Sequence, residues 1–227
     1  MKPVRLVLVS DTHLRHPELP QGDVLVHAGD LTQGGRRDEL KRAIAWLKAQ
    51  PHPHKVAIAG NHDFGLEREP ELARLFEPEV HYLRDEACTV AGLRFWGAPW
   101  TPRFHDWAFN VDRGAPLRAI WERIPPGLDV LVTHGPPHGI LDRTWSGLHV
   151  GCEELRRAVE TKRPRLHVFG HIHEAYGAQW LGGTEFVNAC ICDVWYRAVN
   201  APLVRDLDVP LAATPRPTRG RASGRSS

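Results

Sequence analysis

The chain has 227 residues, 25% of them charged and 42% hydrophobic, which suits a globular protein of one large α/β domain or two small ones. The net charge of only +2 gives no electrostatic reason to expect a long nucleic acid as partner. The first apolar run stops at Asp11, too early for a signal peptide or a membrane span, so we expect a cytoplasmic protein with no membrane partner.

Apolar, β-branched runs alternate along the chain with amphipathic segments. Five runs lack polar alternation and therefore predict strands that are buried on both faces. In chain order these strands are 4–9, 24–27, 56–59, 130–133 and 166–169. The helical patterns lie between them, at 37–50, 71–76, 115–122 and 152–161.

Four shorter segments predict antiparallel strands, at 88–90, 93–96, 177–181 and 184–188. Alternating strands and helices favour layered α/β structure. We therefore predict a four-layer α/β/β/α sandwich of mixed sheets flanked by helices, forming one domain over residues 1–205. Residues 206–227 are predicted to be a disordered tail rich in Arg, Pro and Ser, because the stretch from Thr214 lacks acids and large apolar side chains.

Each buried strand is followed directly by a short polar motif: SDTH, AGD, GNHD, HGPP and GHIH in chain order. Ligands bind at the carboxyl ends of strands in open α/β sheets, so we expect these motifs to share one site. They supply carboxylates, an amide oxygen and imidazoles from Asp11, His13, Asp30, Asn61, His62, His134, His171 and His173.

These groups are N and O donors with no thiolate, a mixture that suits manganese, iron, zinc or cobalt better than calcium. Their number exceeds what one ion needs and suits two ions that share a ligand. Each motif alone is weak, since a lone DxH is more often structural than functional. All five motifs in order, each directly after a predicted strand, form a specific pattern.

The order DxH, GD, GNHD, HG and GHxH resembles the calcineurin-like metallophosphoesterase superfamily, from residue 4 to about residue 188. Two further stretches are similar to its metallophosphoesterase-domain-containing, or brain protein 239-like, branch. They are WGAPWTPRFHDWAFN at 96–110 and THGPPHGILD at 133–142.

The resemblance implies two divalent transition metal ions, with manganese expected first and iron, zinc or cobalt as alternatives. The implied ligands are Asp11, His13 and His173 for the first ion, Asp30 for both ions, and Asn61, His134 and His171 for the second. Because His171 is present, we expect a competent centre with two metals. The two histidines of GHIH would then serve different metals.

The resemblance also implies that His62 and Asp63 act in catalysis. His62 would lie near the scissile phosphate, where it would donate a proton to the leaving oxygen or stabilise the phosphoryl charge. Asp63 would orient His62, although an acid next in sequence can also serve as a simple cap. The implied reaction is hydrolysis of phosphodiester bonds in small substrates, with cyclic nucleotides expected, by attack of a hydroxide that bridges the two metals.

Several residues are candidates for binding the substrate: Asn61, His62, Trp100, His138 and Asn188. Trp100 belongs to an aromatic cluster that also contains Phe104, Trp107 and Phe109. That cluster has two interpretations. It either tethers a loop by packing, as large aromatic side chains commonly do, or forms a wall that stacks on a nucleobase.

Two alternative functions remain open. A nucleotide phosphomonoesterase or phosphatase would use the same metal centre. A non-catalytic nucleotide-binding protein is the other alternative, and the presence of both His62 and His171 argues against it. The expected partner in each case is a small phosphodiester or nucleotide, and the oligomeric state is left open.

Overall fold

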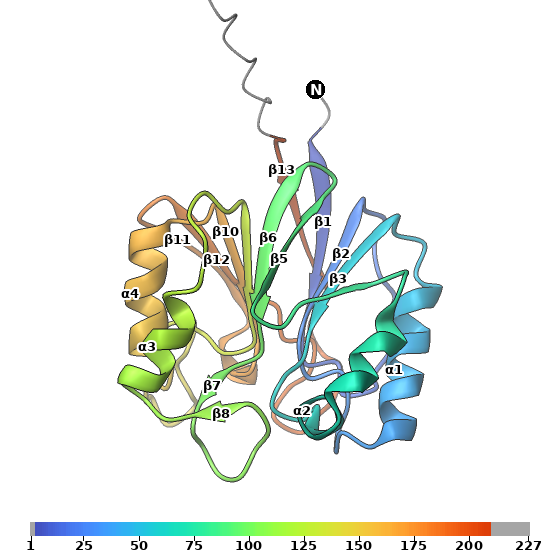
Figure 1. Ribbon diagram of the computed structural model, residues 1–227, viewed down its shortest axis with the longest axis horizontal. Helices are drawn as coiled ribbons and strands as arrows, with labels where there is room; N and C mark the ends of the chain where they lie inside the picture. The colour runs from blue at the N-terminus through green and yellow to red at the C-terminus, as the bar shows by residue number, and fades with distance from the viewer. Residues whose placement is uncertain (1–2, 210–227) are drawn as a thin grey trace, which may run out of the picture.

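The computed structural model describes residues 3–209 and has two β-sheets packed face to face between two helical layers (Figure 1). This arrangement confirms the predicted α/β/β/α sandwich. In the described part of the chain, no helix is long and apolar enough to cross a membrane.

The first sheet has five strands, four of which are parallel. Their spatial order is β13 (Leu203–Leu207), β1 (Val4–Val9), β2 (Val24–Ala28), β3 (His54–Ile58) and β4 (His81–Tyr82). Strand β13 pairs antiparallel with β1 at the edge of this sheet. Strands β1 and β2 are buried on both faces, which explains why their sequences lack polar alternation.

The second sheet has six strands, in the order β11 (Gly177–Leu181), β12 (Thr184–Asn188), β10 (Leu166–Phe169), β9 (Val130–Thr133), β6 (Leu93–Ala98) and β5 (Glu86–Val90). Its four central strands are parallel. The edge strands β11 and β5 pair antiparallel with their neighbours, as the sequence predicts. A separate two-stranded ribbon is formed by β7 (Thr101–Pro102) and β8 (Asn110–Val111).

Helices cover the outer face of each sheet (Figure 1). The first sheet carries α1 (Arg37–Ala49), α2 (Phe64–Arg68) and the 3₁₀ helix η1 (Pro70–Phe76), and the second carries α3 (Ala115–Trp121) and α4 (Glu153–Lys162). Helix α1 buries Leu40, Ala43, Ile44 and Leu47. This i, i+3, i+4, i+7 spacing places one apolar stripe against the sheet.

The main core lies between the two sheets. Leu8 and Val26 of the first sheet pack there with Phe95, Val132 and Val168 of the second, and all five side chains are fully buried. Burying a side chain of this size contributes about 1.5–3 kcal/mol to the stability of the fold, so the contact between the sheets determines their relative position. It thereby also fixes where their strand ends meet.

The structure differs from the sequence prediction mainly in short elements. The segment predicted as a helix at 71–76 is a 3₁₀ helix, and α2, β4, β7 and β8 are too short to show a period in the sequence. The predicted start of the tail at residue 206 is wrong, because β13 continues to Leu207. The rest of the predicted tail, from residue 210, lies outside the described residues.

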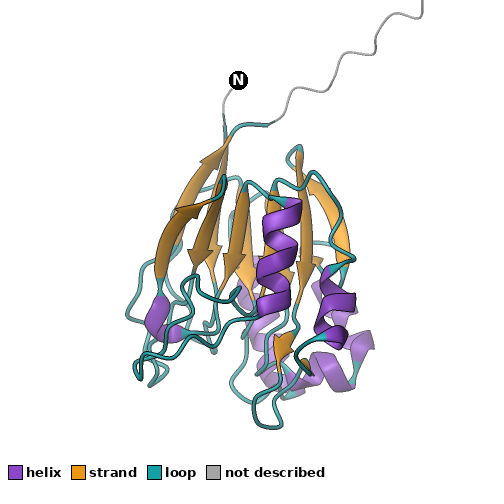
Figure 2. Ribbon diagram, turned by 90° about the vertical axis from the view of Figure 1, so that its left-hand side faces the viewer, coloured by secondary structure: helices purple, strands orange, loops and turns teal. Residues whose placement is uncertain are grey.

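The parallel strands of both sheets end at the same edge of the molecule, where the long loops gather (Figure 2). Backbone hydrogen bonds join the sheets there. Ser10, just after β1, donates to the Ala189 carbonyl and accepts from the Ile191 amide, both at 2.9 Å. The carboxyl ends of β1 and β12 are therefore held side by side.

A buried histidine on β10 couples stability to pH. The ring of His167 lies against Phe169 and Phe186, with centroid separations of 5.0 and 5.7 Å. Its Nε2 lies 2.8 Å from the Thr133 hydroxyl oxygen. Burial lowers the pKa of His167 to about 3. The imidazole is therefore neutral in the folded protein at pH values where a histidine of the unfolded chain gains a proton.

Replacing His167 by Phe should reduce the loss of stability between pH 6 and pH 5. The unfolded histidine, with a pKa of about 6.5, binds a proton in this range and the folded one does not, so acid favours unfolding. Removing the imidazole should lower the slope of the free energy of unfolding against pH by up to about 1.4 kcal/mol per pH unit. Urea denaturation at several pH values, with chelator present, measures this slope. The exposed His81→Phe variant is the control, and an unchanged slope in His167→Phe would contradict the assignment.

Candidate metal centre

The predicted motifs meet where β1, β2, β3, β9 and β10 end. The strand ends place five of the candidate ligands out of contact with solvent, each no more than 1% exposed: Asp11, His13, Asp30, Asn61 and His134. His171 and His173, which follow β10, are partly exposed at the rim. The predicted ligands therefore form one cluster with an open side.

Two groups within this cluster have the spacing of metal ligands. Asp11, His13 and His173 offer ligand atoms that all lie within 4.8 Å of one another, and so do Asp11, Asp30 and His134. The His134 Nε2 atom also lies 2.7 Å from the Asn61 side-chain oxygen.

Asp30 belongs to the second group and also faces the first. Its carboxylate oxygens are 3.4 Å from the Nε2 of His134 and 3.7 Å from the Nε2 of His13. One oxygen of Asp30 therefore faces each of these two imidazoles.

Backbone carbonyls hold three of the imidazoles in place through Nδ1. His13 contacts the Thr32 carbonyl at 3.0 Å, His134 the Ala28 carbonyl at 2.9 Å, and His173 the Asp193 carbonyl at 2.8 Å. A carbonyl oxygen only accepts, so each Nδ1 carries the hydrogen. Each Nε2 then faces the centre and can offer its lone pair to a cation once it carries no proton, which is the arrangement that metal-binding histidines need.

The Asp11 carboxylate uses its two oxygens differently. Oδ2 accepts from the Ser10 hydroxyl at 2.6 Å, the His171 amide at 3.0 Å and the Cys190 thiol at 3.1 Å. Among the described residues, His13 Nε2 is buried without a hydrogen-bond partner, and Asp11 Oδ1 makes no well-aligned hydrogen bond, although His173 Nε2 lies 3.2 Å from it. A buried acceptor without a partner costs about 1–3 kcal/mol. A cation would satisfy both atoms, so the residues present fit a metal site.

The buried carboxylates and imidazoles of this site shift one another's pKa values. Burial alone would raise the pKa of Asp11, but the hydrogen bond and positive charge of His173 and the charge of His134 hold that pKa well below its usual value. Burial would likewise lower the pKa of His173 and of His134. The adjacent carboxylates outweigh burial and raise both values to about 9. The carboxylates therefore draw cations or protons to the centre.

His171 differs from these two imidazoles. Its pKa is lowered to about 3 by burial and by the charge of His134, in spite of the opposing carboxylates. A neutral imidazole offers its lone pair without first losing a proton. His171 is thus suited to be a ligand at the more exposed side of the centre, next to His134, whose ring centroid lies 5.1 Å away.

The glycines of the motifs are required by space. A Cβ at Gly60 would overlap the Asp30 carboxylate, and one at Gly170 would overlap the Asp11 carboxylate. Gly29 has a φ of +97°, which side chains rarely adopt, and a Cβ there would lie 2.7 Å from His134 Nδ1. The GD, GN and GH patterns therefore reflect the close approach of one strand end to the next.

The metal-site turns hold non-glycine residues in the left-handed region. The φ values are 53° at Asp11, 44° at His13, 57° at Asp30 and 69° at His171. Such conformations cost free energy and persist only where the surroundings enforce them. Here they turn side chains from neighbouring strands toward one point.

His62 lies beside the centre, but its orientation comes from a different residue than predicted. Its Nδ1 is 2.7 Å from the Gln33 carbonyl, and its backbone amide donates to Asp30 at 2.8 Å. Asp63 instead accepts hydrogen bonds from the backbone amides of Gly60, Leu31 and Thr32 and from the Thr32 hydroxyl. Asp63 thus ties two loops together, and the orienting role expected for it belongs to the Gln33 carbonyl.

Burial and the nearby Asp30 charge raise the pKa of Asp63 to about 6, in spite of the hydrogen bonds that it accepts. This carboxyl group is fully buried and acts on the loop backbone. Its place in the sequence, directly after His62, gave no sign of this role.

Three of the predicted substrate-binding residues make structural contacts. The indole of Trp100 donates to Asp85 at 2.8 Å, and the buried amide of Asn188 donates to the Ile172 carbonyl at 2.9 Å. The His138 ring lies 5.9 Å from that of His149. None of these three is among the residues lining the two cavities described next.

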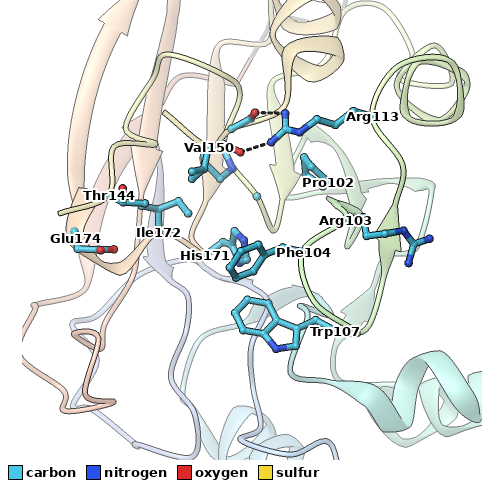
Figure 3. A pocket seen from close by; sticks show the side chains of 13 residues that line it. Pro102, Arg103, Phe104, Trp107, Arg113, Thr144, Val150, His171, Ile172 and Glu174 are labelled. Atoms are coloured by element: carbon cyan, nitrogen blue, oxygen red, sulfur yellow. Dashed lines mark hydrogen bonds between the residues drawn. The ribbon is translucent and has the colours of Figure 1, made fainter. Parts of the chain in front are cut away.

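A cavity of about 340 Å³ opens beside His171 (Figure 3). Its lining is mostly apolar, with Arg103, Arg113 and Glu174 as its charged members. The apolar wall includes Pro102, Phe104, Trp107, Pro136, Val150 and Ile172. Arg113 is held by the carbonyls of Val150 and Gly151, both at 2.8 Å, and so supports the wall.

The members of the aromatic cluster lie in two different places. Phe104 and Trp107 line this cavity near His171, whereas Trp100 and Phe109 pack on each other at 5.6 Å. Phe109 is fully buried.

A second, shallower recess of about 160 Å³ lies over the metal ligands. It is lined by Asp30, Asn61, His62, Trp107, His171, His173, Glu174, Val194 and Tyr196. Trp107, His171 and Glu174 border both spaces, so the cavity adjoins the centre directly. Sequence reasoning did not single out Glu174 or Tyr196. Glu174 follows GHIH directly, whereas Tyr196 stands in a loop without a recognisable motif.

Comparison with known proteins supports the resemblance to the calcineurin-like metallophosphoesterases that the sequence motifs indicate. The calcineurin-like phosphoesterase family profile matches residues 4–175. Metallophosphoesterase domain-containing protein 1 of Homo sapiens is 43% identical over 234 residues, covering 91% of this chain and 72% of that protein. A UPF0046 protein of Caenorhabditis elegans is 37% identical over 235 residues, covering 93% of this chain and 83% of that protein.

One solved crystal structure superposes with a TM-score of 0.64 at 18% identity, covering 82% of this chain and 90% of that chain. At this identity the likeness supports the fold alone. The family match spans all five motifs and stops just beyond His173, so it includes every predicted metal ligand. The chain therefore belongs to the calcineurin-like phosphoesterase family, in the branch of the metallophosphoesterase domain-containing proteins.

Proposed function

We propose that this metal-dependent phosphoesterase is a phosphodiesterase with two divalent metal ions, acting on small substrates of the cyclic nucleotide class. The observation that carries the proposal is the pair of ligand groups, each within 4.8 Å, together with the Asp30 oxygens, which lie 3.4 Å from His134 of one group and 3.7 Å from His13 of the other. The first ion would be held by Asp11, His13 and His173. Asn61, His134 and His171 would hold the second ion, and Asp30 would contact both.

The donor set suits manganese, with iron, zinc or cobalt as alternatives, because it combines carboxylates and imidazoles. When bound, divalent cations would neutralise phosphate charge, polarise the phosphoryl oxygens and lower the pKa of a coordinated water. The chain contributes the ligand positions, fixed by strand ends and by carbonyl bonds to Nδ1. It also contributes a largely buried floor, in which charges interact more strongly than in water.

In the proposed reaction, His62 donates a proton to the leaving oxygen. Its Nδ1 is committed to the Gln33 carbonyl, so Nε2 is the atom that can deliver a proton to the leaving oxygen. Its backbone amide donates to Asp30, which ties the position of the imidazole to the bridging carboxylate. A positioned acid of this kind contributes about 10²–10⁴-fold to the rate.

The cavity beside His171 supports an aromatic substrate group. Its volume of about 340 Å³ and its apolar lining suit a flat ring that packs against the wall formed by Phe104 and Trp107, whose own rings meet edge to face at 5.2 Å. The ring of Trp107 is 6.1 Å from that of His171 and 5.5 Å from that of His62, so a nucleobase in the cavity would lie next to the reacting phosphate. This wall favours a nucleotide over inorganic or protein phosphate.

The same centre would also serve a nucleotide phosphomonoesterase, and this remains the second candidate. A partner of either enzyme is a small phosphodiester or nucleotide. The two candidates differ in which ester they hydrolyse, and a direct comparison of diester and monoester substrates separates them.

Removing the metal ions by chelation should lower the melting temperature. Bound cations favour the folded state because their ligands come from five separate loops that converge only on folding. A free cation concentration 100 times the Kd stabilises by about 2.7 kcal/mol, equivalent to roughly 5–10 °C in a chain of this size. Calorimetry of the manganese-loaded protein before and after chelation measures the shift. Chelation should lower the melting temperature of the Asp11→Asn variant by less. A wild-type melting temperature that chelation leaves unchanged would count against the metal site.

Replacing His171 by Ala should remove one bound metal and reduce phosphodiester hydrolysis at least about 100-fold, because the second ion loses a ligand. Metal content and hydrolysis of bis(p-nitrophenyl) phosphate and p-nitrophenyl phosphate in Mn²⁺ measure both effects. His81→Ala, on the exposed strand β4, is the control. Hydrolysis of the monoester alone by the wild type would favour the phosphomonoesterase. Full diester activity in His171→Ala would sink the two-metal proposal.

Replacing Trp107 by Ala should raise the KM for a cyclic nucleotide about 10-fold while metal content stays unchanged. Stacking on one base is worth about 1–3 kcal/mol, and Trp107→Phe should keep much of it. Trp180→Ala is the matched control, because Trp180 is 67% exposed on β11, outside both cavities. Equal KM values in Trp107→Ala and the wild type would show that the base does not bind in this cavity.

A further inference from the structure

The loop after β12 returns across the metal centre and carries Tyr196. This residue has a φ of 59°, in the left-handed region that tyrosine rarely adopts. Its amide donates to the Asp193 carbonyl at 2.8 Å, and its own carbonyl accepts from the Arg15 guanidinium at 3.0 Å. Contacts on both sides therefore hold the backbone in this strained position.

The same loop is tied to a predicted metal ligand. The Asp193 carbonyl that accepts from the Tyr196 amide also lies 2.8 Å from His173 Nδ1. The placement of the tyrosine and the orientation of the imidazole thus depend on one carbonyl group. Strain that is held by a metal-site contact commonly marks a functional position.

The tyrosine ring packs against the centre, and its side chain lines the recess above it. Its centroid lies 4.7 Å from that of His13, edge to face, and 5.8 Å from those of His62 and His173. The side chain is only partly buried, so a ligand in the recess can reach it.

The hydroxyl of Tyr196 lies 3.5 Å from His62 Nε2. Because Nδ1 of His62 is committed to the Gln33 carbonyl, Nε2 and the hydroxyl are the two polar groups that face each other. When His62 also carries the Nε2 proton that its proposed role as acid requires, Nε2 and the hydroxyl are both donors. Two donors 3.5 Å apart can both reach one oxygen atom at about 2.8 Å from each. A hydroxyl hydrogen also rotates freely to suit its acceptor.

We propose that the Tyr196 hydroxyl is a catalytic group that donates a hydrogen bond to the phosphoryl group in the recess, on the side that faces His62. The inference rests on the proposed function, since it names a further contact to the same phosphate. A phosphoryl oxygen carries negative charge, and a hydrogen bond to a charged group is stronger than one between neutral groups. The tyrosine would hold the phosphate in line with the proton donor.

Tyr196→Phe separates this role from a structural one, because phenylalanine keeps the ring that packs on His13 and removes only the hydroxyl. Tyr176→Phe is the matched control. The hydroxyl of Tyr176 donates to the Ala201 carbonyl at 2.9 Å, outside both cavities. Both variants should bind two Mn²⁺ ions and melt at the wild-type temperature.

The measurements use manganese-loaded protein and two probes, inorganic phosphate by calorimetric titration and bis(p-nitrophenyl) phosphate by steady-state kinetics. In Tyr196→Phe, phosphate affinity and kcat/KM should each fall about 10-fold or more, the loss expected for one hydrogen bond to a charged group. Tyr176→Phe should match the wild type in both. Wild-type values for both quantities in Tyr196→Phe would overturn the assignment.

The two probes also distinguish failure of this inference from failure of the proposed function. If no protein hydrolyses the diester but phosphate affinity still falls in Tyr196→Phe alone, the diesterase proposal fails and the contact stands. If the wild type hydrolyses the diester and Tyr196→Phe matches it in both measurements, the contact fails and the function stands. Loaded wild-type protein that neither binds phosphate nor hydrolyses the diester would overturn both.

Discussion

The site depends on two carboxylates, Asp11 and Asp30, that lie side by side almost wholly out of contact with water. Two buried like charges are costly unless opposite charge or hydrogen bonds compensate them. Three donors occupy Asp11 Oδ2, and imidazoles face the remaining oxygens of the pair. The turns, the glycines and the joined ends of the two sheets place these donors and imidazoles close enough to contact the two carboxylates.

The ligands were predictable because they obey a local rule. Each follows a buried strand directly, and the ends of parallel strands meet at one edge of a sheet. The sequence therefore predicts that Asp11, Asp30, His134 and His171 lie together, and the structure has them in one cluster. The need for glycine in these motifs could be explained only from the structure, because the atoms that leave no room for a side chain belong to another strand end. Gly170, for example, is restricted by the carboxylate of Asp11, 159 positions earlier in the chain.

Contacts made through loop backbone could not be predicted. Any residue type at position 33 offers the carbonyl that orients His62, so nothing in the sequence marks Gln33. The sequence predicts that role for Asp63 because it is the next residue, yet its side chain accepts from the Leu31 and Thr32 amides of another loop. Trp100 and Trp107 likewise stand in one aromatic stretch, and only tertiary packing decides that the second faces the cavity.

The candidate metal ligands and the residues proposed to hold the substrate therefore lie on different parts of the fold. The metal ligands follow strands whose positions are set by the core between the sheets, so they tolerate little change. Phe104, Trp107 and Tyr196 stand on loops that contact the centre from outside and contribute nothing to that core. On the proposed function, a change in these loops would alter which phosphate ester is held without moving a candidate metal ligand. The shared metal motifs thus establish the reaction class, whereas the substrate has to be argued from the loops of this particular chain.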